Sequence, residues 1–395
     1  MRISLRDRTG TFAAAGCFAL TPVSIAASEL LLGIALLARF PTLVRGRSAF
    51  RLPRVFWFWI VWAVLTVASC LRAGAFRECA GEVRHLVLIA ALFFVVPALD
   101  GVRSRLAMWR AVFLTSAAGS LALIVGFIVR IIRFQHEIAA GGDPAFYLRN
   151  GGFLHHWMIY ATVEGMIFGA MLEFRASRPE ERRWLDPIIA IHCVAILLSL
   201  TRALWLACAI VLALHIVWRR PRLVWALAAA PALALLLAPG PIRSRVTETL
   251  DSGYYSTAER LQMWEVGLRM IREHPLIGVG AGRVEKLYPT YLSAGEPLPA
   301  YHGHLHNNAL QIAAQFGLPV LAAALFCLAV LAIDLLRECR HARDGDAHLL
   351  ARCGLLALAA FLITGMTDYT YGHSLGLILL AFAALTPLVP RTVLQ

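Results

Sequence analysis

Residues 308–336 read NALQIAAQFGLPVLAAALFCLAVLAIDLL, and Asp334 is the only charged residue among them. A run of this length exceeds the roughly 20 apolar residues with which a helix crosses a bilayer. Similar runs recur along the chain: of its 395 residues, 59% are hydrophobic and 15% are charged. Soluble proteins are about 45–50% apolar and about 25% charged. The composition therefore excludes an ordinary soluble enzyme or a disordered chain and predicts an all-α polytopic membrane protein.

The apolar runs, separated at helix-breaking residues, predict about twelve transmembrane helices. Nine of them lie in residues 1–239, a long polar interruption occupies 240–306, and three lie in 307–395. The interruption is too short for a separate domain, and we expect it to cap one face of the bundle. The predicted spans are 11–22, 25–40, 55–71, 85–100, 108–131, 153–174, 184–200, 203–218, 222–239, 308–336, 350–366 and 374–390.

The distribution of arginine predicts the orientation of these spans. The chain has 37 Lys+Arg against 24 Asp+Glu, and Lys286 is its only lysine. Loops on one side of the membrane hold 23 arginines and the short loops on the other side hold seven. Because positive residues gather in cytoplasmic loops, we expect both termini in the cytoplasm and residues 240–306 outside. The net charge of +13 is thus assigned to topology, and no nucleic-acid partner is expected.

The eight cysteines show no CxxC pair and no metal-ligand spacing. Most of them lie in or beside apolar runs, and only Cys79 falls in a short loop that we place outside. We therefore expect no disulfide framework.

The polar interruption contains a predicted amphipathic helix. Ser256-Thr257-Ala258-Glu259 is a capping-box pattern that begins a helix, and Gly278-Val279-Gly280 after Pro275 marks its end. Leu261, Trp264, Leu268 and Ile271 form its predicted apolar stripe, which we expect to face the bilayer or the bundle.

Two arginines of this helix project differently. At about 100° per residue, Arg260 lies within about 40° of Trp264, at the edge of the stripe, whereas Arg269 lies opposite and is expected to be solvated. For Arg260, a side chain that snorkels at the membrane surface is the alternative to a ligand-binding role.

A histidine-rich segment, Tyr301-His302-Gly303-His304-Leu305-His306-Asn307-Asn308, precedes the tenth span. Three histidines two residues apart suit a metal site, but no carboxylate or cysteine is adjacent in the sequence. The alternatives are histidines at a membrane interface or one histidine that acts as a general base.

Three further features are weaker. Arg202 lies between two closely spaced spans, where an arginine without an acidic neighbour suits an anionic partner such as a phosphate. Arg149 precedes Gly151-Gly152, which form a turn or permit the close approach of a ligand. Glu29, Glu164 and His192 lie inside predicted spans, where they mark a transport path or pack helices together.

Three ordered motifs resemble the O-antigen ligase and polymerase superfamily. They are T-R-A-L-W from Thr201, R-x-x-x-W-x-x-G-L-x-M-I-x-x-x-P-L-x-G-V-G-A-G from Arg260, and H-N-N-A-L-Q-I-A-A-Q-F-G-L-P from His306. The resemblance covers the seventh to tenth spans closely and the remainder in topology only. Gln315 departs from the pattern, because the family often has glutamate there.

The resemblance implies transfer of an undecaprenyl-pyrophosphate-linked glycan to a hydroxyl at the outer face of a bacterial inner membrane. It implies that Arg202 and Arg260 hold the pyrophosphate and that His306 is the general base. His302, His304, Asn307 and Arg149 are further candidates for substrate binding. The implied reaction is independent of metal and needs no cofactor, since the arginines replace the divalent ion.

Several functions are compatible with this resemblance. Polymerases usually have two sizeable outer loops, and protein O-oligosaccharyltransferases usually carry a long soluble tail. One large outer loop, and a chain that ends about five residues after the last span, favour the ligase, whose acceptor is lipid A–core oligosaccharide. A polyisoprenoid-lipid transporter is a more distant alternative, which requires paired charges deep in the bundle.

Overall fold

The computed structural model describes residues 5–44, 52–74, 77–99, 101–223, 243, 255–299, 301–342 and 344–389. Within these ranges the chain is helical and forms no strand. Six of the described helices are long and apolar enough to cross a membrane: α3 (Val55–Arg72), α4 with the following turn (Ala80–Ala98), α5 (Gly101–Arg133), α10 (Arg202–Arg219), α16 (Leu318–His341) and α17 (Gly345–Gly365). The chain is therefore an all-α, multi-pass membrane protein, as predicted. The number of twelve spans stays a prediction.

Most of the other predicted spans are also helices. They are α1 (Leu5–Ala19), α2 (Ile25–Val44), α8 (Trp157–Ser177), α9 (Arg182–Leu198) and α18 (Ser374–Leu385). The helix α8 is long enough to span, but Glu164 and Glu173 interrupt its apolar sequence, and both are buried. The predicted span 222–239 lies outside the described residues except for its first two.

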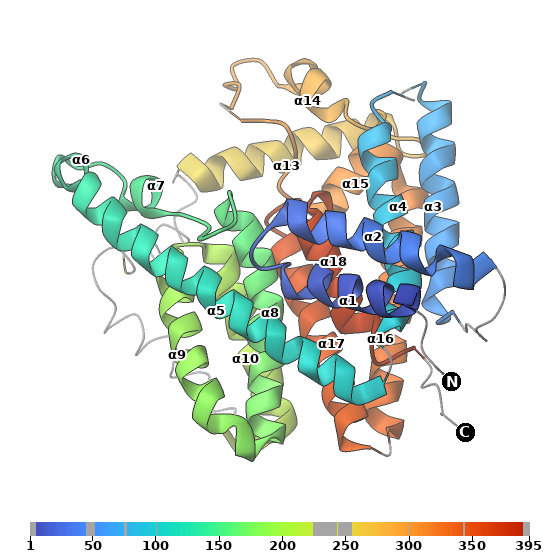
Figure 1. The fold of residues 1–395 in the computed structure, drawn as a ribbon. Helices are drawn as coiled ribbons and strands as arrows, with labels where there is room; N and C mark the ends of the chain where they lie inside the picture. Colours follow the sequence, from blue (N-terminus) through green and yellow to red (C-terminus); the bar gives the residue numbers. More distant parts are fainter. Residues whose placement is uncertain are drawn as a thin grey trace.

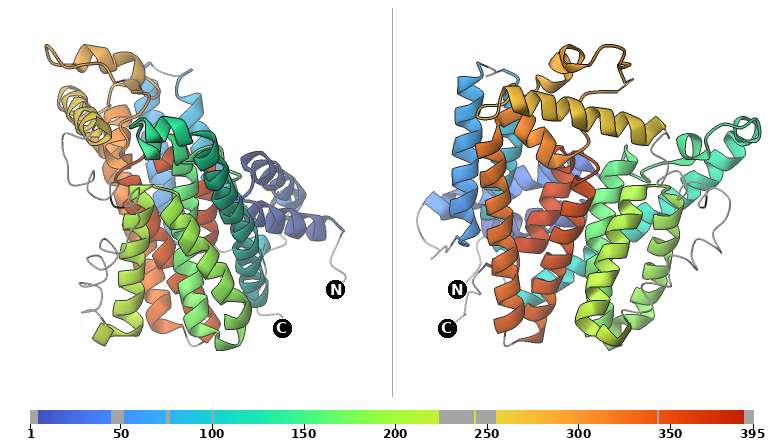
Figure 2. Two further views of the ribbon diagram at one scale, coloured as in Figure 1. Left: turned by 90° about the vertical axis from the view of Figure 1, so that its left-hand side faces the viewer. Right: turned by 180° about the vertical axis from the view of Figure 1, so that it is seen from behind.

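The first two helices form a hairpin that lies across the other helices rather than beside them. Figures 1 and 2 show α1 and α2 transverse to α3, α4, α16 and α17. Phe18 of α1 stacks on Phe382 of α18, with ring centroids 4.9 Å apart. The hairpin is thus fastened to the core through its apolar face.

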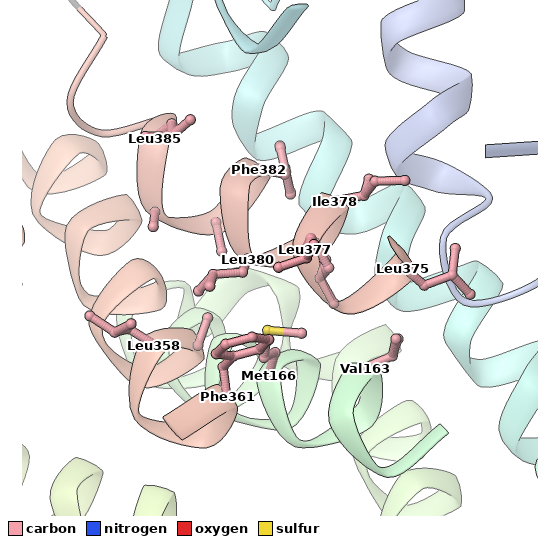
Figure 3. Close-up of a cluster of buried hydrophobic side chains, with 14 of the residues drawn as sticks. Val163, Met166, Leu358, Phe361, Leu375, Leu377, Ile378, Leu380, Phe382 and Leu385 are labelled. Carbon is pink, nitrogen blue, oxygen red and sulfur yellow. The ribbon is translucent and has the colours of Figure 1, made fainter. Parts of the chain in front are cut away.

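The helix α18 forms the centre of the bundle. It packs against α4, α8 and α17, and nearly all of its residues are buried. Figure 3 shows its leucines against Val163 and Met166 of α8 and Phe361 of α17. A helix that is apolar all round is typical of such a position. Its 12 residues extend about 18 Å at 1.5 Å per residue.

Ion pairs join the helices at two depths. Glu164 of α8 accepts a hydrogen bond from Ser116 of α5 (2.8 Å) and lies 3.3 Å from His192 of α9. These three side chains are almost completely buried. Nearer the other end of the bundle, buried Glu173 contacts Arg219 at 2.7 Å and Arg352 at 3.4 Å. Glu164 and His192 are therefore partners that link helices, not scattered groups.

The predicted tenth span is two helices. Gly317 has φ +88° and ψ 168° and separates α15 (Asn308–Phe316) from α16. A Cβ at Gly317 would clash with the backbone of Leu276 and Ile277. Leu318 N donates to Pro275 O at 2.7 Å, and Gly280 N donates to Gln315 O at 3.0 Å. The glycines of the 275–282 motif therefore permit one backbone to lie directly on another.

The helices of the polar interruption cap one end of the bundle. The helix α13 (Tyr255–Glu273) crosses above the other helices, and α14 (Val284–Leu287) lies over it (Figure 1). Met263, Val266 and Met270 of α13 form a small core with Leu305 and Tyr288. The cap is thus packed through its own apolar residues, and α13 begins and ends close to where the sequence predicts.

A disulfide joins Cys70 and Cys79 between α3 and α4, contrary to our expectation. The sequence does not indicate this disulfide, because the two cysteines meet only when the ends of these helices pack side by side. The same turn supports the cap: Arg283 donates to Ala73 O and Gly74 O, each at 3.0 Å, and Ser69 Oγ donates to Ile277 O at 2.8 Å.

We expect Gly317→Ala to destabilise the protein. Its backbone conformation is essentially restricted to glycine, and such strain costs roughly 1–3 kcal/mol before the clash with Leu276 is added. The melting temperature of the purified protein in detergent should fall. Gly33→Ala is the matched control, because Gly33 is exposed in α2 with open space around it and should tolerate the methyl group. Equal melting temperatures for both variants would contradict this explanation.

Candidate functional site

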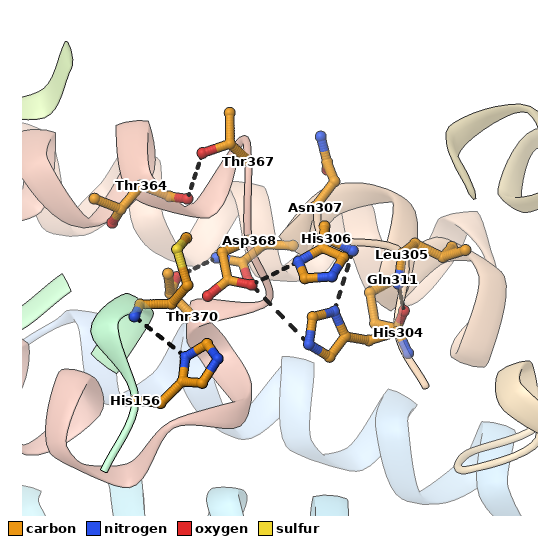
Figure 4. A network of polar contacts seen from close by, with 12 residues as sticks. His156, His304, Leu305, His306, Asn307, Gln311, Thr364, Thr367, Asp368 and Thr370 are labelled. Atoms are coloured by element: carbon orange, nitrogen blue, oxygen red, sulfur yellow. Dashed lines mark hydrogen bonds and ion pairs between the residues drawn. The ribbon is translucent and has the colours of Figure 1, made fainter. Parts of the chain in front are cut away.

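His306 forms a hydrogen bond with a carboxylate that is distant in sequence. Its Nδ1 lies 3.0 Å from Oδ1 of Asp368, which is in the loop between α17 and α18 (Figure 4). Asp368 is buried, with 1% of its surface exposed. Burial alone would raise the pKa of Asp368, but the hydrogen bond from His306 and the nearby imidazole of His373 hold it well below its usual range. The carboxylate is therefore charged, and it orients the imidazole.

His304 packs against the same pair. Its ring centroid lies 4.1 Å from that of His306, and its Nδ1 accepts a hydrogen bond from the backbone N–H of His306 at 3.2 Å. Burial lowers the pKa of His304 to about 3, helped by the nearby His306 and opposed by Asp368. His304 is thus a neutral side chain whose Nδ1 is already occupied as an acceptor.

Other histidines complete the surroundings of Asp368. His373 Nε2 lies 3.7 Å from Asp368 Oδ2. His156, which caps the N-terminus of α8 by accepting from Met158 N, lies beside the network in Figure 4. Burial lowers the pKa of His156, and Asp368 opposes that shift. The negative charge of Asp368 is therefore balanced by hydrogen bonds and histidines from three separate segments.

The two asparagines after His306 hold the Asp368 loop in place. Asn307 Oδ1 caps α15 by accepting from Leu310 N at 3.1 Å, and its Nδ2 donates to Met366 O at 3.0 Å. Asn308 donates to Thr370 Oγ1 at 2.8 Å and accepts from Tyr371 N at 3.1 Å. The H-N-N sequence is thus explained: one residue contacts the carboxylate, and the next two fix the loop that carries it.

The backbone of His306 is in the left-handed region, with φ +47°. Such a conformation is unfavourable for a residue with a Cβ and is retained where the surroundings enforce it. Here the cap at Asn307 and the packing of Leu305 under α13 fix both neighbours of His306. The imidazole is therefore held in a single position.

Arg202 reaches the helix of the cap from the start of α10. Its guanidinium donates to Ser256 Oγ and Thr257 Oγ1, each at 3.2 Å. Arg260 is half-buried and follows these residues by one turn of α13, so it shares their face of the helix. The structure thus brings Arg202 to the part of α13 that carries Arg260.

The same helix also leads to His306. A Cβ at Gly267 would clash with the side chain of Leu305, which places Leu305 against α13. Gly267 follows Arg260 by two turns, or about 10 Å at 1.5 Å per residue. Arg260 is part of α13, Arg202 contacts the start of this helix, and His306 follows the residue that packs against it. All three therefore lie at the same end of the bundle.

The predicted apolar stripe of α13 is divided between two surroundings, since Trp264 and Ile271 pack against the small core of the cap and Leu261 and Leu268 face outward. Met263, Val266, Gly267 and Met270 are the buried residues, whereas Leu261 and Leu268 are each 42% exposed. Sequence periodicity identified a helix with apolar residues on more than one side but could not tell which side the bundle covers.

The predicted solvated role of Arg269 is also wrong. Arg269 forms two hydrogen bonds of 2.8 Å with Glu296 and another with Tyr291 O, and thereby fastens the loop that follows α14. Glu296 is its main ionic partner, at 2.8 Å, and Glu265 is a weaker one at 3.6 Å. Arg269 therefore serves the structure of the cap.

Two other predicted residues lie apart from Asp368. His302 packs on Tyr288 with ring centroids 5.4 Å apart, and its Nδ1 lies 3.1 Å from Pro299 O. Arg149 lies over the ring of Trp157 at 4.6 Å. A Cβ at Gly152 would clash with Gly119 O, so that glycine permits contact with α5 rather than with a ligand.

Two cavities flank the Asp368 network. An apolar cavity of about 480 Å³ begins at Asn307 and Met366 and extends between α3, α16 and α18 as far as Leu385. A polar pocket of about 320 Å³ lies among Arg130, Arg149 and residues 150–155. Neither lining includes Arg202, Arg260 or His306, so these three do not line a single one of these cavities.

Asp368 is the residue that sequence analysis missed. It lies 62 positions from His306, and the histidine segment has no adjacent carboxylate. One signal existed: Asp368 is an acidic residue in the short polar break between the last two predicted spans, which the arginine count places on the outer side. Asp368, His304 and His306 offer ligand atoms within 4.8 Å of one another. The fold thus supplies the carboxylate that a metal site lacked in the adjacent sequence.

The chain also contains one D-x-D sequence, Asp344-Gly345-Asp346, a pattern that binds a divalent ion in many sugar-diphosphate enzymes. Asp344 caps α17 by accepting from Asp346 N at 3.0 Å. Asp346 pairs with Arg178. Both aspartates lie at the opposite end of α17 from Asp368, so this sequence has a structural role there.

The low pKa of His304 predicts a pH-dependent stability. A free histidine titrates near pH 6.5, whereas His304 titrates at about 3, so the unfolded chain binds an extra proton between these values. The unfolding free energy should be fully present above about pH 6.5 and should fall as the pH decreases towards 3. Melting temperatures at pH 7.5, 6 and 5 should decrease less for His304→Gln than for the wild type. The exposed His136, changed to Gln, is the control and should leave the pH profile unaltered.

Residues 187–325 match the family described as O-antigen ligase. The matched range begins within α9 and contains Arg202, Arg260 and His306, whereas Asp368 lies beyond it. No curated protein matches the chain significantly. The resemblance stated from the three motifs is confirmed over this range, which is similar to the O-antigen ligase family of membrane-bound glycosyl-transfer enzymes.

Proposed function

We propose that this protein is an O-antigen ligase of the bacterial inner membrane. It transfers a glycan from undecaprenyl pyrophosphate to lipid A–core oligosaccharide, with both termini in the cytoplasm and the site on the periplasmic side. The hydrogen bond between His306 and Asp368 is the observation that carries this proposal. It gives a family enzyme an oriented base at the end of a bundle where lipid-linked substrates meet water.

His306 acts as the general base. Nδ1 donates to Asp368, which leaves the lone pair of Nε2 for the acceptor hydroxyl. As Nε2 takes the proton, the acceptor oxygen bonds to the anomeric carbon of the donor glycan. The bond from that carbon to the pyrophosphate oxygen breaks, and undecaprenyl pyrophosphate leaves. Asp368 stabilises the imidazolium that forms.

Arg202 and Arg260 hold the donor pyrophosphate. Guanidinium groups bind phosphate oxygens through two parallel hydrogen bonds, and these strengthen as the leaving group gains charge. The hydroxyl groups of Ser256 and Thr257, which Arg202 contacts, hold its guanidinium one helical turn from Arg260. The position of α13 supports this role. The helix carries Arg260, contacts Arg202 at its start, and packs against Leu305, the neighbour of His306.

The apolar cavity suits the hydrocarbon tail of a lipid substrate. It begins beside Asn307 and extends along α16 and α18, with Trp59, Trp62 and Phe93 on its far wall. Each CH₂ that remains out of water contributes about 0.8 kcal/mol, so a long tail needs such a surface next to the reacting group. The exposed Leu261 and Leu268 support a position of α13 at the membrane surface.

The disulfide supports the orientation. Disulfides persist in oxidising compartments such as the periplasm and are rare in the cytosol. Cys70–Cys79 lies at the end of the bundle that carries α13, because the neighbouring backbone at Ala73 and Gly74 contacts Arg283. This argument is independent of the arginine count and points the same way.

A transporter is less well supported. Glu164 and His192 form the kind of charge pair deep in the bundle that a transporter requires, but with Ser116 they form a fully buried cluster that lines neither of the two cavities. Their contacts fasten α5, α8 and α9.

We expect His306→Ala to lose transfer activity by about 10²–10⁴-fold, the usual contribution of a general base. Purified enzyme, undecaprenyl-pyrophosphate-linked glycan and lipid A–core acceptor would be mixed in detergent, and the product measured by mass spectrometry. Asp368→Asn should also lose activity and should shift the pH–rate profile, because the imidazolium loses its counter-charge. Near-wild-type activity of His306→Ala would contradict the proposal.

The controls separate a base from a metal site. His302→Ala should be mild, because His302 packs on Tyr288 instead of contacting Asp368. Chelator should leave the wild-type rate unchanged. Equal loss in His304→Ala, His306→Ala and Asp368→Ala, together with chelator sensitivity, would replace the base by a metal ion.

We expect Arg202→Lys and Arg260→Lys to remain nearly inactive. Lysine keeps the charge but lacks the planar group that binds two phosphate oxygens at once. The same transfer assay, with donor concentration varied, should show that both variants lose binding of the donor. Arg272→Lys is the matched control, since Arg272 is an exposed arginine on the same helix. Full activity of either lysine variant would count against a role in binding the pyrophosphate.

A further inference from the structure

The polar pocket beside α8 is not used by the mechanism above. Its volume is about 320 Å³, enough for one sugar ring with a substituent, and it is lined by the end of α5, by α7 (Pro144–Leu148), by residues 149–155 and by Trp157. Arg130, Arg149, Asn150 and His155 provide polar groups, and Trp157 and Phe146 provide aromatic ones. Aromatic and guanidinium groups together are suited to a sugar that carries a negative charge.

The pocket is positively charged. Among the described residues, its lining includes two arginines and no carboxylate. Arg130 donates to Tyr147 O at 3.0 Å, and Arg149 Nε donates to Ala145 O at 2.7 Å, so both side chains are anchored to the backbone of α7. Asn150 fixes the floor, since it donates to Leu123 O at 3.3 Å and accepts from Gly152 N at 3.1 Å. The arginines are therefore preorganised on a rigid frame.

The frame of the pocket is joined to the proposed active site on two sides. Leu148 packs with Leu200, two residues before Arg202. Tyr255, at the start of α13, donates to Asp143, which caps α7, at 3.1 Å. His155 lines the pocket, and its neighbour His156 lies beside Asp368 (Figure 4). A molecule in this pocket is thus next to the network that holds His306.

The two cavities are lined by different neighbours of the Asp368 network. Asn307 and Met366 line the apolar cavity, and His155, the neighbour of His156, lines the polar pocket. The proposed mechanism already assigns Arg202 and Arg260 to the donor pyrophosphate. A second cationic pocket, which lies beside Arg202 but does not include it, is therefore suited to the other substrate.

We propose that this pocket binds an anionic group, a phosphate or a carboxylate, on the acceptor saccharide. Arg149 and Arg130 bind that group, and Trp157 supports Arg149 from below, with the guanidinium carbon 4.6 Å from the ring centroid. The acceptor hydroxyl is thereby directed towards His306. This inference rests on the proposed function, because it assigns a binding site to the acceptor of that reaction.

The test measures binding and transfer separately. Core oligosaccharide freed of its lipid would be titrated into purified protein in nanodiscs by microscale thermophoresis, in native, dephosphorylated and carboxyl-reduced forms. Removal of the recognised group should raise the Kd roughly 10- to 100-fold, the usual effect of a hydrogen bond to a charged group. The form that weakens identifies the phosphate or the carboxylate. Equal Kd values for all three forms would overturn the proposal.

Variants then locate the site. Arg149→Gln and Arg130→Gln should each raise the Kd of the native oligosaccharide and should abolish the difference between native and modified forms. Arg133→Gln is the matched control, because Arg133 is exposed one turn beyond Arg130 and does not line the pocket. If both variants keep the wild-type difference between the forms, the anion binds elsewhere and the proposal is wrong.

The transfer assay distinguishes the two proposals. Arg149→Gln should raise KM for the acceptor and leave KM for the donor unchanged, which also shows that the variant is folded. A rise in KM for the donor alone would assign the pocket to the pyrophosphate and overturn the inference. Absence of transfer by the wild-type protein, with the expected pattern of Kd values, would contradict the ligase function while the anion site stands.

Discussion

A buried negative charge, the carboxylate of Asp368, is the constraint on which this site depends. A charge removed from water needs partners, and here they come from segments far apart in the chain. His306 supplies a hydrogen bond, His373 lies opposite, and Asn307 and Asn308 fix the loop on which the carboxylate lies. The residues of this loop from Asp368 to Tyr371 are buried. The loop and the H-N-N sequence thus belong to one arrangement.

The cap depends on close approach between backbones. Gly278 and Gly317 allow the segment before α14 to lie on the junction of α15 and α16, and Cβ atoms at either position would clash with main-chain atoms. This contact sets the height of α13 above the bundle. The small core around Met263 and Leu305 then fixes its rotation, and with it the direction of Arg260. The motif that identifies the family in the sequence is therefore largely a packing motif, and Arg260 is positioned by it.

Sequence patterns predicted most helices because each depends on residues near one another in the chain. Apolar runs located α3, α10 and α17 to within a few residues, and the break at Gly317 was missed because a glycine inside an apolar run does not interrupt the pattern. The motifs predicted the candidate residues Arg202 and His306, whose roles remain predictions. The buried face of α13 could not be predicted, because two of its faces carry apolar residues and only contact with Leu305 decides between them.

The sequence by itself determined that the chain is an all-α membrane protein and that residues 187–325 resemble the O-antigen ligase family, because composition and ordered motifs are properties of the linear chain. Only the tertiary structure decided that Asp368 is the partner of His306, that Cys70 joins Cys79, and that Glu164 contacts His192. Each of these pairs consists of polar or reactive groups in segments that meet when helices pack. A buried charge must find a partner in space, and nothing in the linear order of residues states which partner that is.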